Sequence, residues 1–568
     1  MTDNVMFGRP VRAVYNASGN VVGLSAGNTE LDDSILPPHI PDARFILENT
    51  AGIYQQTGVS RAITDIASRI PKTIWYVSSE ATNGFVVGND ANSGASKALA
   101  KLTLGSAFAA ASSGDVIIIN DSETPYDSAF YNINKAVTIL PWTARGVTLR
   151  STFASYTFLI GASSITFGAV IIDTNATGAS ALRSVSAPCD KLRLVGTKLL
   201  AHSTYFLNHI GTVEMVGGVN FVSTGAAKSI ITLPTASAGG VTLGAETMID
   251  GYVLHNPSVA GVNFTATKTK IRGTAAGATS AFQSTGAASY LIEDCDIGMD
   301  TSTAGTGILI TPHATLACET VTIRRNTVSH GVAAAQQTSG YGIAVGNETA
   351  IAETIHNVAI YENDIRHANH GLFAGYGISS GYSRGNVVRD TIIGCITKGN
   401  TCGFIQSANI IIGGPLTGGA LRAKTSSNAK FYNNLVIYNA QSVAGGVALL
   451  SSNTAVLSEF RNNIVYAPAL LLSSAVSIPV GDTASLNDND YYAGSYGATA
   501  FSYSGTTYAT VALWKAAIES TALGVDPLFT GLSDWTLSSG SPCRGIGAQV
   551  IGTDFMGRTM TNNLGPFA

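Results

Sequence analysis

A short pattern of apolar and polar residues recurs along the second half of this 568-residue chain. In each copy, a run of Ile, Val, Phe or Tyr leads into a polar turn and a second apolar pair. The copies are residues 290–297, 321–328, 358–365, 390–396, 430–436 and 459–465, and they align Cys295, Asn326, Asn363, Cys395, Asn434 and Asn463, with successive separations of 31, 37, 32, 39 and 29 residues. A period in this range is typical of a chain that stacks one supersecondary unit on the next.

The residues within each copy indicate short β-strands. Val, Ile and Thr are frequent, whereas a leucine-rich horseshoe would repeat every 20–29 residues or so with Leu dominant. At the bend between strands, an Asn side chain can turn inward and bond the equivalent amide one coil away, and Cys fits the same slot. We therefore predict an all-β, right-handed, single-stranded parallel β-helix, a solenoid whose core grows along one axis.

Composition agrees with this prediction and excludes several classes of protein. The chain is 45 % hydrophobic and only 12 % charged, which argues against disorder. Its net charge of −4 indicates neither nucleic-acid binding nor attraction to an anionic membrane, and we expect no membrane insertion. The six cysteines have no metal-type spacing, so we expect free, buried thiols in a chain folded in a reducing cytoplasm.

We expect four regions along the chain. Residues 1–70 form a leader for docking or oligomerisation, with a hairpin at 9–25, a Pro-rich linker at 36–41 and an apolar helical stripe at 60–70. Residues 71–115 form a capping segment with a short helix at 102–111. Residues 116–485 form the β-helix. Residues 486–568 complete and cap it, with a helix at 511–517.

Both ends of the expected solenoid resemble known β-helix proteins. A strand at 76–78, an Asn/Gly loop at 88–94, the helix at 102–111 and a buried strand at 114–119 resemble the capped entry of many right-handed β-helix proteins. The C-terminal order resembles the terminal region of many bacterial and phage β-helix proteins that act at cell surfaces. It comprises Asp490-Tyr-Tyr, the helix at 511–517, Asp526-Pro-Leu-Phe529, Gly540-Ser-Pro-Cys543 and Asp554-Phe-Met-Gly-Arg558.

The resemblance spans roughly residues 75–568 and is to bacteriophage tailspikes and polysaccharide depolymerases. It implies a receptor-binding homotrimer on the virion, assembled in the host cytoplasm, with the leader docked to phage tail or baseplate proteins. Such a protein binds a bacterial surface polysaccharide (capsule or O-antigen) for host attachment and cleaves it by hydrolysis or β-elimination. The absence of a signal-peptide pattern at the N-terminus favours this class. A monomeric bacterial lyase or hydrolase and a non-enzymatic fibre or adhesin are the alternatives.

Ionisable residues are sparse, so their clustering between 294 and 370 identifies candidate catalytic groups. The repeat alignment puts Asp294, Arg325 and Glu362 on one rung and Asp296, Thr327 and Asp364 on another. It also makes His330 and His367 equivalent. Carboxylates two coils apart would lie about 10 Å from each other, near the upper limit for an inverting glycosidase. The catalytic candidates are Asp294, Asp296, His330, Glu362, Asp364 and His367. The alternative is an exposed ion-pair stack with ordinary turn histidines.

The predicted sugar-binding groups lie beside these candidates. Aromatic faces stack on sugar rings, and Arg bonds hydroxyls or carboxylates. The candidates are Arg324, Arg325, Tyr361, Phe373, Tyr376, Tyr382 and Arg384. Four of them fall in 371–384, which is interpreted as a loop and could equally be a plain excursion between coils. No metal site or cofactor is expected, except that the oxygen-rich stretch 487–490 could bind calcium or simply form a turn.

Overall fold

The computed structural model describes residues 11–15, 21–26 and 73–567. Gaps occur at 130, 144–146, 154–155, 162–163, 175–179, 185–188, 202–204, 209–210, 224–228, 233–239, 256, 258–260, 274–278, 286–287, 300–304, 332–339, 352–353, 400–403, 414–417, 427, 439–445, 453–456, 532–533, 557 and 560–561. The chain forms two units, residues 1–70 and 71–568. In the first unit, β1 (Val11–Tyr15) pairs antiparallel with β2 (Val21–Ala26), which confirms the predicted hairpin. The predicted linker at 36–41 and helix at 60–70 lie outside the described residues.

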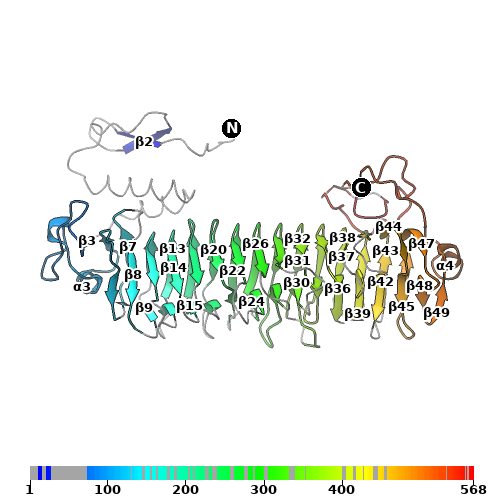
Figure 1. Cartoon of the computed structure of the whole chain (residues 1–568), viewed down its shortest axis with the longest axis horizontal. Helices are drawn as coiled ribbons and strands as arrows, with labels where there is room; N and C mark the ends of the chain where they lie inside the picture. The colour runs from blue at the N-terminus through cyan, green and yellow to red at the C-terminus, as the bar shows by residue number, and fades with distance from the viewer. Residues whose placement is uncertain are drawn as a thin grey trace. The chain divides into compact units, whose positions relative to one another are not determined.

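The second unit is a right-handed parallel β-helix, as predicted, in which successive strands fall on three faces (Figure 1). The first face has sixteen strands: β3 (Ile74–Val77), β4 (Val116–Ile119), β7 (Val137–Pro141), β10 (Ser164–Gly168), β13 (Cys189–Val195), β16 (Gly211–Val216), β19 (Val241–Leu243), β22 (Val262–Thr267), β25 (Ala288–Glu293), β28 (Val321–Arg324), β31 (Val358–Tyr361), β34 (Gly381–Arg384), β37 (Ile405–Ser407), β40 (Lys430–Tyr432), β43 (Ser458–Arg461) and β46 (Ala484–Asn487).

The second face has fifteen strands: β5 (Tyr126–Ser128), β8 (Thr148–Ser151), β11 (Ile171–Asp173), β14 (Lys198–Ala201), β17 (Asn220–Ser223), β20 (Met248–Asp250), β23 (Lys270–Arg272), β26 (Asp296–Met299), β29 (Thr327–His330), β32 (Asp364–Arg366), β35 (Val387–Arg389), β38 (Ile410–Ile412), β41 (Leu435–Ile437), β44 (Ile464–Leu472) and β47 (Asp490–Tyr496).

The third face consists of two hydrogen-bonded sets of strands. The first set is β6 (Tyr131–Ile133), β9 (Tyr156–Ile160), β12 (Ser180–Ser184), β15 (Tyr205–Asn208) and β18 (Ser229–Thr232). The second set is β21 (Val253–His255), β24 (Ser280–Ser284), β27 (Thr306–Ile310), β30 (Tyr341–Val345), β33 (His370–Ala374), β36 (Ile393–Gly399), β39 (Leu421–Ser426), β42 (Val447–Ser452), β45 (Ser474–Ile478), β48 (Phe501–Tyr503) and β49 (Thr506–Tyr508).

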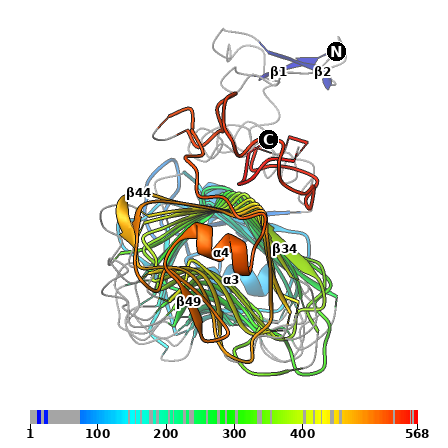
Figure 2. The same ribbon diagram turned by 90° about the vertical axis from the view of Figure 1, so that its right-hand side faces the viewer.

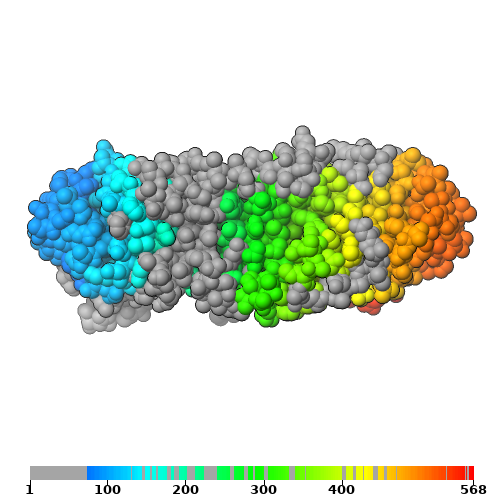
Figure 3. Space-filling model, turned by 90° about the horizontal axis from the view of Figure 1, so that it is seen from below, coloured from blue at the N-terminus to red at the C-terminus, as the bar shows by residue number. Residues whose placement is uncertain are grey.

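Alternation along each strand separates the core from the surface. Inward Ile, Val, Leu and Phe side chains form one continuous apolar core, in which equivalent residues stack from coil to coil. The rings of Phe431 and Phe460, for example, lie 5.0 Å apart at an interplanar angle of 7°. On the outer surface, residues succeed one another along the solenoid in sequence order (Figure 3). No helix among the described residues is long and apolar enough to cross a membrane.

Each end of the solenoid is covered by a short helix. At the start, the predicted helix is present as α3 (Leu104–Ala110), preceded by the 3-10 turn η2 (Lys97–Leu99). Thr103 caps α3 by accepting a hydrogen bond from the backbone N–H of Ser106. At the other end, α4 (Val511–Ala517) matches the predicted helix and buries Trp514. Figure 2 shows α4 lying across the end of the solenoid. These helices cover core side chains that the terminal coils would otherwise expose.

An asparagine ladder runs through the turn between the first and second faces. Its members are Cys295, Asn326, Asn363, Asn386, Asn409, Asn434, Asn463 and Asn489. Each Asn Oδ1 accepts the backbone N–H of the preceding member, at 2.9–3.1 Å, and from Asn363 onward also its side-chain amide. The carboxylate of Glu519 closes the ladder by accepting both donors of Asn489.

The structure confirms the predicted asparagine ladder, but one of its six predicted members is wrong. Cys395 is not a member, because it lies in β36 on the third face and pairs with Leu372 and Leu421. The true members in this region are Asn386 and Asn409, each separated by 23 residues from the member before it. The repeat alignment therefore stepped over two short coils. Four of the cysteines, including Cys395, are free and buried as expected, and the other two fall outside the described side chains.

After α4 the chain folds back along the outside of the solenoid, and we name residues 523–567 the C-terminal strap. Its apolar side chains pack against outward residues of β38, β41 and β44, which include Ile410, Leu435 and Ile464. The strap is also held at the turns, where Asn433 Nδ2 donates to the carbonyls of Asn563 and Gly565. The predicted boundaries at 115 and 485 stay predictions.

Candidate functional site

The predicted carboxylates do lie at the turn between the first and second faces. Asp296, Thr327 and Asp364 are Cα partners on adjacent coils. Asp294, Arg325 and Glu362 each adopt a left-handed conformation, with φ of 55°, 54° and 58°, one residue before a ladder member. This single left-handed residue turns the chain from one face to the next and leaves its own side chain outside.

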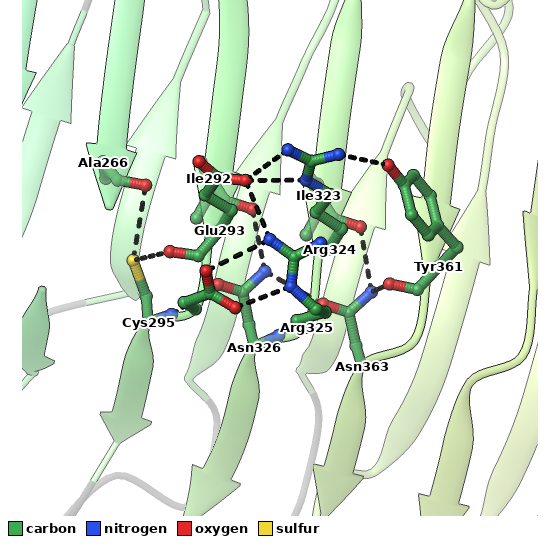
Figure 4. A network of polar contacts seen from close by, with 11 residues as sticks. Ala266, Ile292, Glu293, Cys295, Ile323, Arg324, Arg325, Asn326, Tyr361 and Asn363 are labelled. Atoms are coloured by element: carbon green, nitrogen blue, oxygen red, sulfur yellow. Dashed lines mark hydrogen bonds and ion pairs between the residues drawn. The ribbon is translucent and has the colours of Figure 1, made fainter. Parts of the chain in front are cut away.

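Arginine side chains form ion pairs with most of these carboxylates. Arg325 Nε lies 2.7 Å from Asp294 Oδ1, and the hydrogen bond lowers the pKa of Asp294. Glu293 accepts from Arg324 at 2.6 Å and from Arg325 at 3.1 Å (Figure 4). Such pairs are partly exposed and contribute little stability. A carboxylate kept ionised in this way is also a poor proton donor.

The second rung shows the same pairing. Asp296 bonds Arg272 of the preceding coil. Asp364 accepts from Arg366, and its other oxygen lies 3.3 Å from Arg389 Nε. Glu362 is exposed. The stack of exposed ion pairs that was the alternative interpretation therefore describes Asp294, Asp296 and Asp364 well, and their catalytic roles stay predictions.

Two predicted site residues have buried side chains, which argues against their predicted roles. His330 is 2 % exposed, its Nε2 lies 2.7 Å from the carbonyl of Gly305, and burial lowers its pKa. Phe373 is also 2 % exposed and packs against Ile393 and Ile396. Neither side chain can reach a polymer in solution. His367 does lie at the surface, with Nε2 3.5 Å from Asp390 Oδ2.

The predicted loop at 371–384 is also wrong. It contains the end of β33 and all of β34, joined by a tight connection at 375–380. Tyr376 lies in that connection at the edge of the third face, and Tyr382 and Arg384 are on the outer side of the first face. The aromatic residues of this segment therefore belong to two different faces.

A second cluster, which was not predicted, lies at the edge of the third face. Tyr341 donates its hydroxyl hydrogen to Glu348, and Lys398 Nζ donates to the other carboxylate oxygen at 2.5 Å. The cations of Arg422 and Lys424 also act electrostatically on Glu348. We call Tyr341, Glu348, Lys398, Arg422 and Lys424 the third-face cluster.

The register of the strands places these cations together. Lys398 and Lys424 are Cα partners on adjacent coils, and both occupy outward positions. Glu348 follows β30 through Gly346, where a Cβ would lie 2.7 Å from the backbone of Gly375. Only glycine allows this close approach. The bridge between Asn347 and Tyr376 then holds the segment that carries Glu348 beside Lys398.

Burial and charge set the protonation of the cluster. Burial raises the pKa of Tyr341, and the neighbouring Glu348 raises it further, so the phenol keeps its proton. Burial opposes ionisation of Glu348, but the bonds from Lys398 and Tyr341 outweigh it and lower the pKa. Burial lowers the pKa of Lys424, against the attraction of Glu348. The side-chain exposures of Glu348 (43 %) and Lys398 (13 %) leave the cluster open to solvent.

Neutral rings border the third-face cluster. His370 stacks on Tyr341 with ring centroids 4.8 Å apart, and burial lowers its pKa to about 4. Tyr376 lies with its ring centroid 5.9 Å from Lys398 Nζ. The site thus combines a phenol that is hydrogen-bonded to a carboxylate, three basic side chains and neighbouring aromatic rings. This set can neutralise an anionic ligand and can both donate and accept a proton.

A sequence signal for this cluster exists, and the misaligned Cys395 hid it. Gly394-Cys-Ile-Thr-Lys398 and Ala420-Leu-Arg-Ala-Lys424 share a small residue, an inward apolar residue and an outward Lys. A Cβ on Gly394 would lie 2.4 Å from the carbonyl of Ala420, so the small residue is required there. Alignment on this position would have stacked the two lysines.

Metal binding at 487–490 gains no support from the geometry. Asn489 belongs to the ladder, and Asp490 accepts from the backbone N–H of Val525 and from Cys543 in the interior. In the described part of the chain, no three His, Cys, Asp or Glu side chains are placed to share a metal ion. Calcium binding stays an untested prediction.

Comparison with known proteins gives distant structural similarity only. No family model and no curated protein matches the chain. Solved structures that match include the complex of XylC with xylose (10 % identity, 87 % of this chain and 98 % of that one, TM-score 0.32). Pectate lyase Pel9A matches at 12 % identity over 88 % and 96 % of the two chains, with a TM-score of 0.25. The Azotobacter vinelandii mannuronan C-5 epimerase AlgE6 A-module matches at 10 % over 74 % and 93 %, with a TM-score of 0.24. Similarity at this level does not bear on activity.

Proposed function

We propose that the third-face cluster binds an acidic bacterial surface polysaccharide and cleaves it by β-elimination. The observation that carries the proposal is the convergence of Lys398, Arg422 and Lys424 on one half-exposed carboxylate. A uronate chain offers carboxylates that such cations attract. Lys398 and Arg422 together outweigh the single carboxylate of Glu348, which makes an acidic polymer a better ligand than a neutral one.

Each step of an elimination has a candidate group in the cluster. Arg422 and Lys398 neutralise the uronate carboxylate, which makes the adjacent C5 proton easier to remove. Lys424, whose pKa burial lowers, is the candidate base for that proton. The C5–H electron pair forms the C4–C5 double bond as the C4–O bond breaks. Tyr341, which keeps its proton, donates it to the leaving oxygen, and Lys424 then returns a proton to the phenolate through solvent.

The cleavage experiment measures new unsaturated ends by ultraviolet absorbance. The substrates are alginate, polygalacturonate and acidic capsular polysaccharides, with neutral dextran as the uncharged comparison. We expect wild-type protein to release ends from at least one acidic polymer and none from dextran. Lys398→Met and Glu348→Gln should lower the rate at least about tenfold, a loss of about 1.4 kcal/mol in the transition state.

Lys198→Met is the matched control, because Lys198 is an exposed lysine on the second face, in β14. It should leave the rate unchanged. Elimination at this site would be refuted if wild-type protein gave no unsaturated ends from any acidic polymer. It would also be refuted if the control Lys198→Met lost as much activity as Lys398→Met. New reducing ends without unsaturation would indicate hydrolysis. Binding without any new ends would support the fibre or adhesin alternative.

The biological setting that we propose is a phage tailspike. The chain would be a receptor-binding homotrimer on the virion, with residues 1–70 attached to tail or baseplate proteins. Support comes from the solenoid, which is capped at both ends, and from residues 1–70, which form a unit of their own. Light scattering should give a mass near three times 58.5 kDa that persists on dilution. A monomer would refute the trimer and favour a free-standing enzyme.

A further inference from the structure

The outer side of the first face carries a row of charged and aromatic residues in register. Glu293, Arg324, Tyr361 and Arg384 are successive Cα partners on four adjacent coils. In the neighbouring row, Tyr382 follows the small residues Thr322 and Ala359. Tyr382 is exposed at this position, and Tyr361 is half-buried.

The two tyrosines form a stacked pair held by arginine. Their ring centroids are 6.5 Å apart at an interplanar angle of 27°. The Arg324 guanidinium lies 5.9 Å from the centre of the Tyr361 ring and donates to its hydroxyl at 2.9 Å. Arg384 lies 5.9 Å from the Tyr382 ring and also bonds Thr553 of the C-terminal strap. These contacts order the rings before any ligand binds, so little conformational entropy remains to be lost.

One member of this pair, Tyr382, is joined to the border of the third-face cluster by a single short connection between β33 and β34. Tyr376, near Lys398, and Tyr382 are six residues apart, so at most about 20 Å of extended chain separates them. The connection between them is short and includes Ser380, which is exposed. A polymer bound at the cluster can therefore continue around the edge onto the first face.

We propose that Tyr361 and Tyr382, with Arg324 and Arg384, form a second polysaccharide-binding surface that holds the polymer beyond the cleavage site. The inference rests on the proposed function, since the same acidic polymer would occupy both surfaces. Sugar rings stack on the exposed tyrosine, and the arginines bond carboxylates or hydroxyls. The surface contributes to binding of long chains only, because a short oligosaccharide seated at the cluster does not extend to it.

The test compares Tyr382→Ala with Phe153→Ala. The two aromatic residues are equally exposed, at 36 % and 37 %, but Phe153 lies far along the solenoid after β8. The probes are alginate and polygalacturonate, each as polymer and as trisaccharide. We expect Tyr382→Ala to raise KM for the polymer about three- to tenfold, the range expected for loss of one stacking contact. The kcat for the polymer and the cleavage of the trisaccharide should not change, and Phe153→Ala should change nothing.

The possible failures separate the two proposals. An unchanged KM for the polymer, or an equal change with the trisaccharide, would overturn the second surface and leave the cleavage site intact. If wild-type protein cleaves neither polymer, KM cannot be measured. Binding is then measured as the retardation of the protein in native gels that contain each polymer. Weaker retardation of Tyr382→Ala than of Phe153→Ala would then support the surface although elimination has failed. No retardation of wild-type protein would overturn both.

Discussion

The asparagine ladder predicts that equal substitutions at two of its positions have unequal effects. Asn409 and Asn326 are both buried ladder members, and each donates two side-chain hydrogen bonds. They differ in what they accept. Asn409 Oδ1 accepts the backbone N–H and the side-chain amide of Asn386, at 3.1 and 2.9 Å. Asn326 Oδ1 accepts only the backbone N–H of Cys295, at 2.9 Å.

The expected magnitudes follow from the donors that are left without an acceptor. A buried unsatisfied donor costs about 1–3 kcal/mol. Asn409→Ala leaves two such donors, so its free energy of unfolding should fall by about 2–6 kcal/mol on this account. Asn326→Ala leaves one, which gives about 1–3 kcal/mol. The loss of each residue's own donors is common to both variants and cancels in the comparison.

The assay is guanidinium unfolding followed by circular dichroism, with hydrogen exchange at the affected amides. Coils of a solenoid can open locally, so exchange reports the damage where it occurs. Asn409→Ala should have the lower unfolding midpoint and should lose protection at the Asn386 amide. Equal midpoints, or a larger loss for Asn326→Ala, would refute the assignment of ladder energy to accepted hydrogen bonds.

Three further predictions concern pH. Burial raises the pKa of Asp490 to about 7, so the folded state binds this proton more tightly than the unfolded state does. The free energy of unfolding should therefore fall by up to about 4 kcal/mol as pH rises from about 4 to 7. Denaturant midpoints of Asp490→Asn should not show this fall. Burial lowers the pKa of His255 to about 3, so stability should fall by up to about 5 kcal/mol as pH drops from about 6.5 to 3, and His255→Phe should remove that dependence in acid-unfolding curves. The elimination rate should rise with pH through the lowered pKa of Lys424, and an unchanged pH–rate profile in Lys424→Arg would contradict its role as the base.

Local signals made the fold predictable. Inward Ile and Val, a bend with Asn and short strands are all contained in segments of about ten residues, and each coil repeats them. The capping helices were predictable for the same reason, since α3 follows the capping residue Thr103 and buries one apolar stripe. Register was harder, because coils differ in length. Between Asn363 and Asn409 they shorten to 23 residues, and an alignment that expected about 32 skipped to Cys395.

The sequence by itself determined the solenoid, its ladder and the presence of tyrosines and arginines near residues 361–384. Only the tertiary structure decided which of these side chains share a face. Glu348 and Lys424 are 76 residues apart in sequence, and the parallel pairing of β36 with β39 brings Lys424 beside Lys398 and its partner Glu348. A shift of one residue in a strand exchanges inside and outside. His330 occupies an inward position of β29, and Phe373 is buried in a separate apolar cluster with Ile393 and Ile396. The third-face cluster, in contrast, is assembled at the surface from several segments.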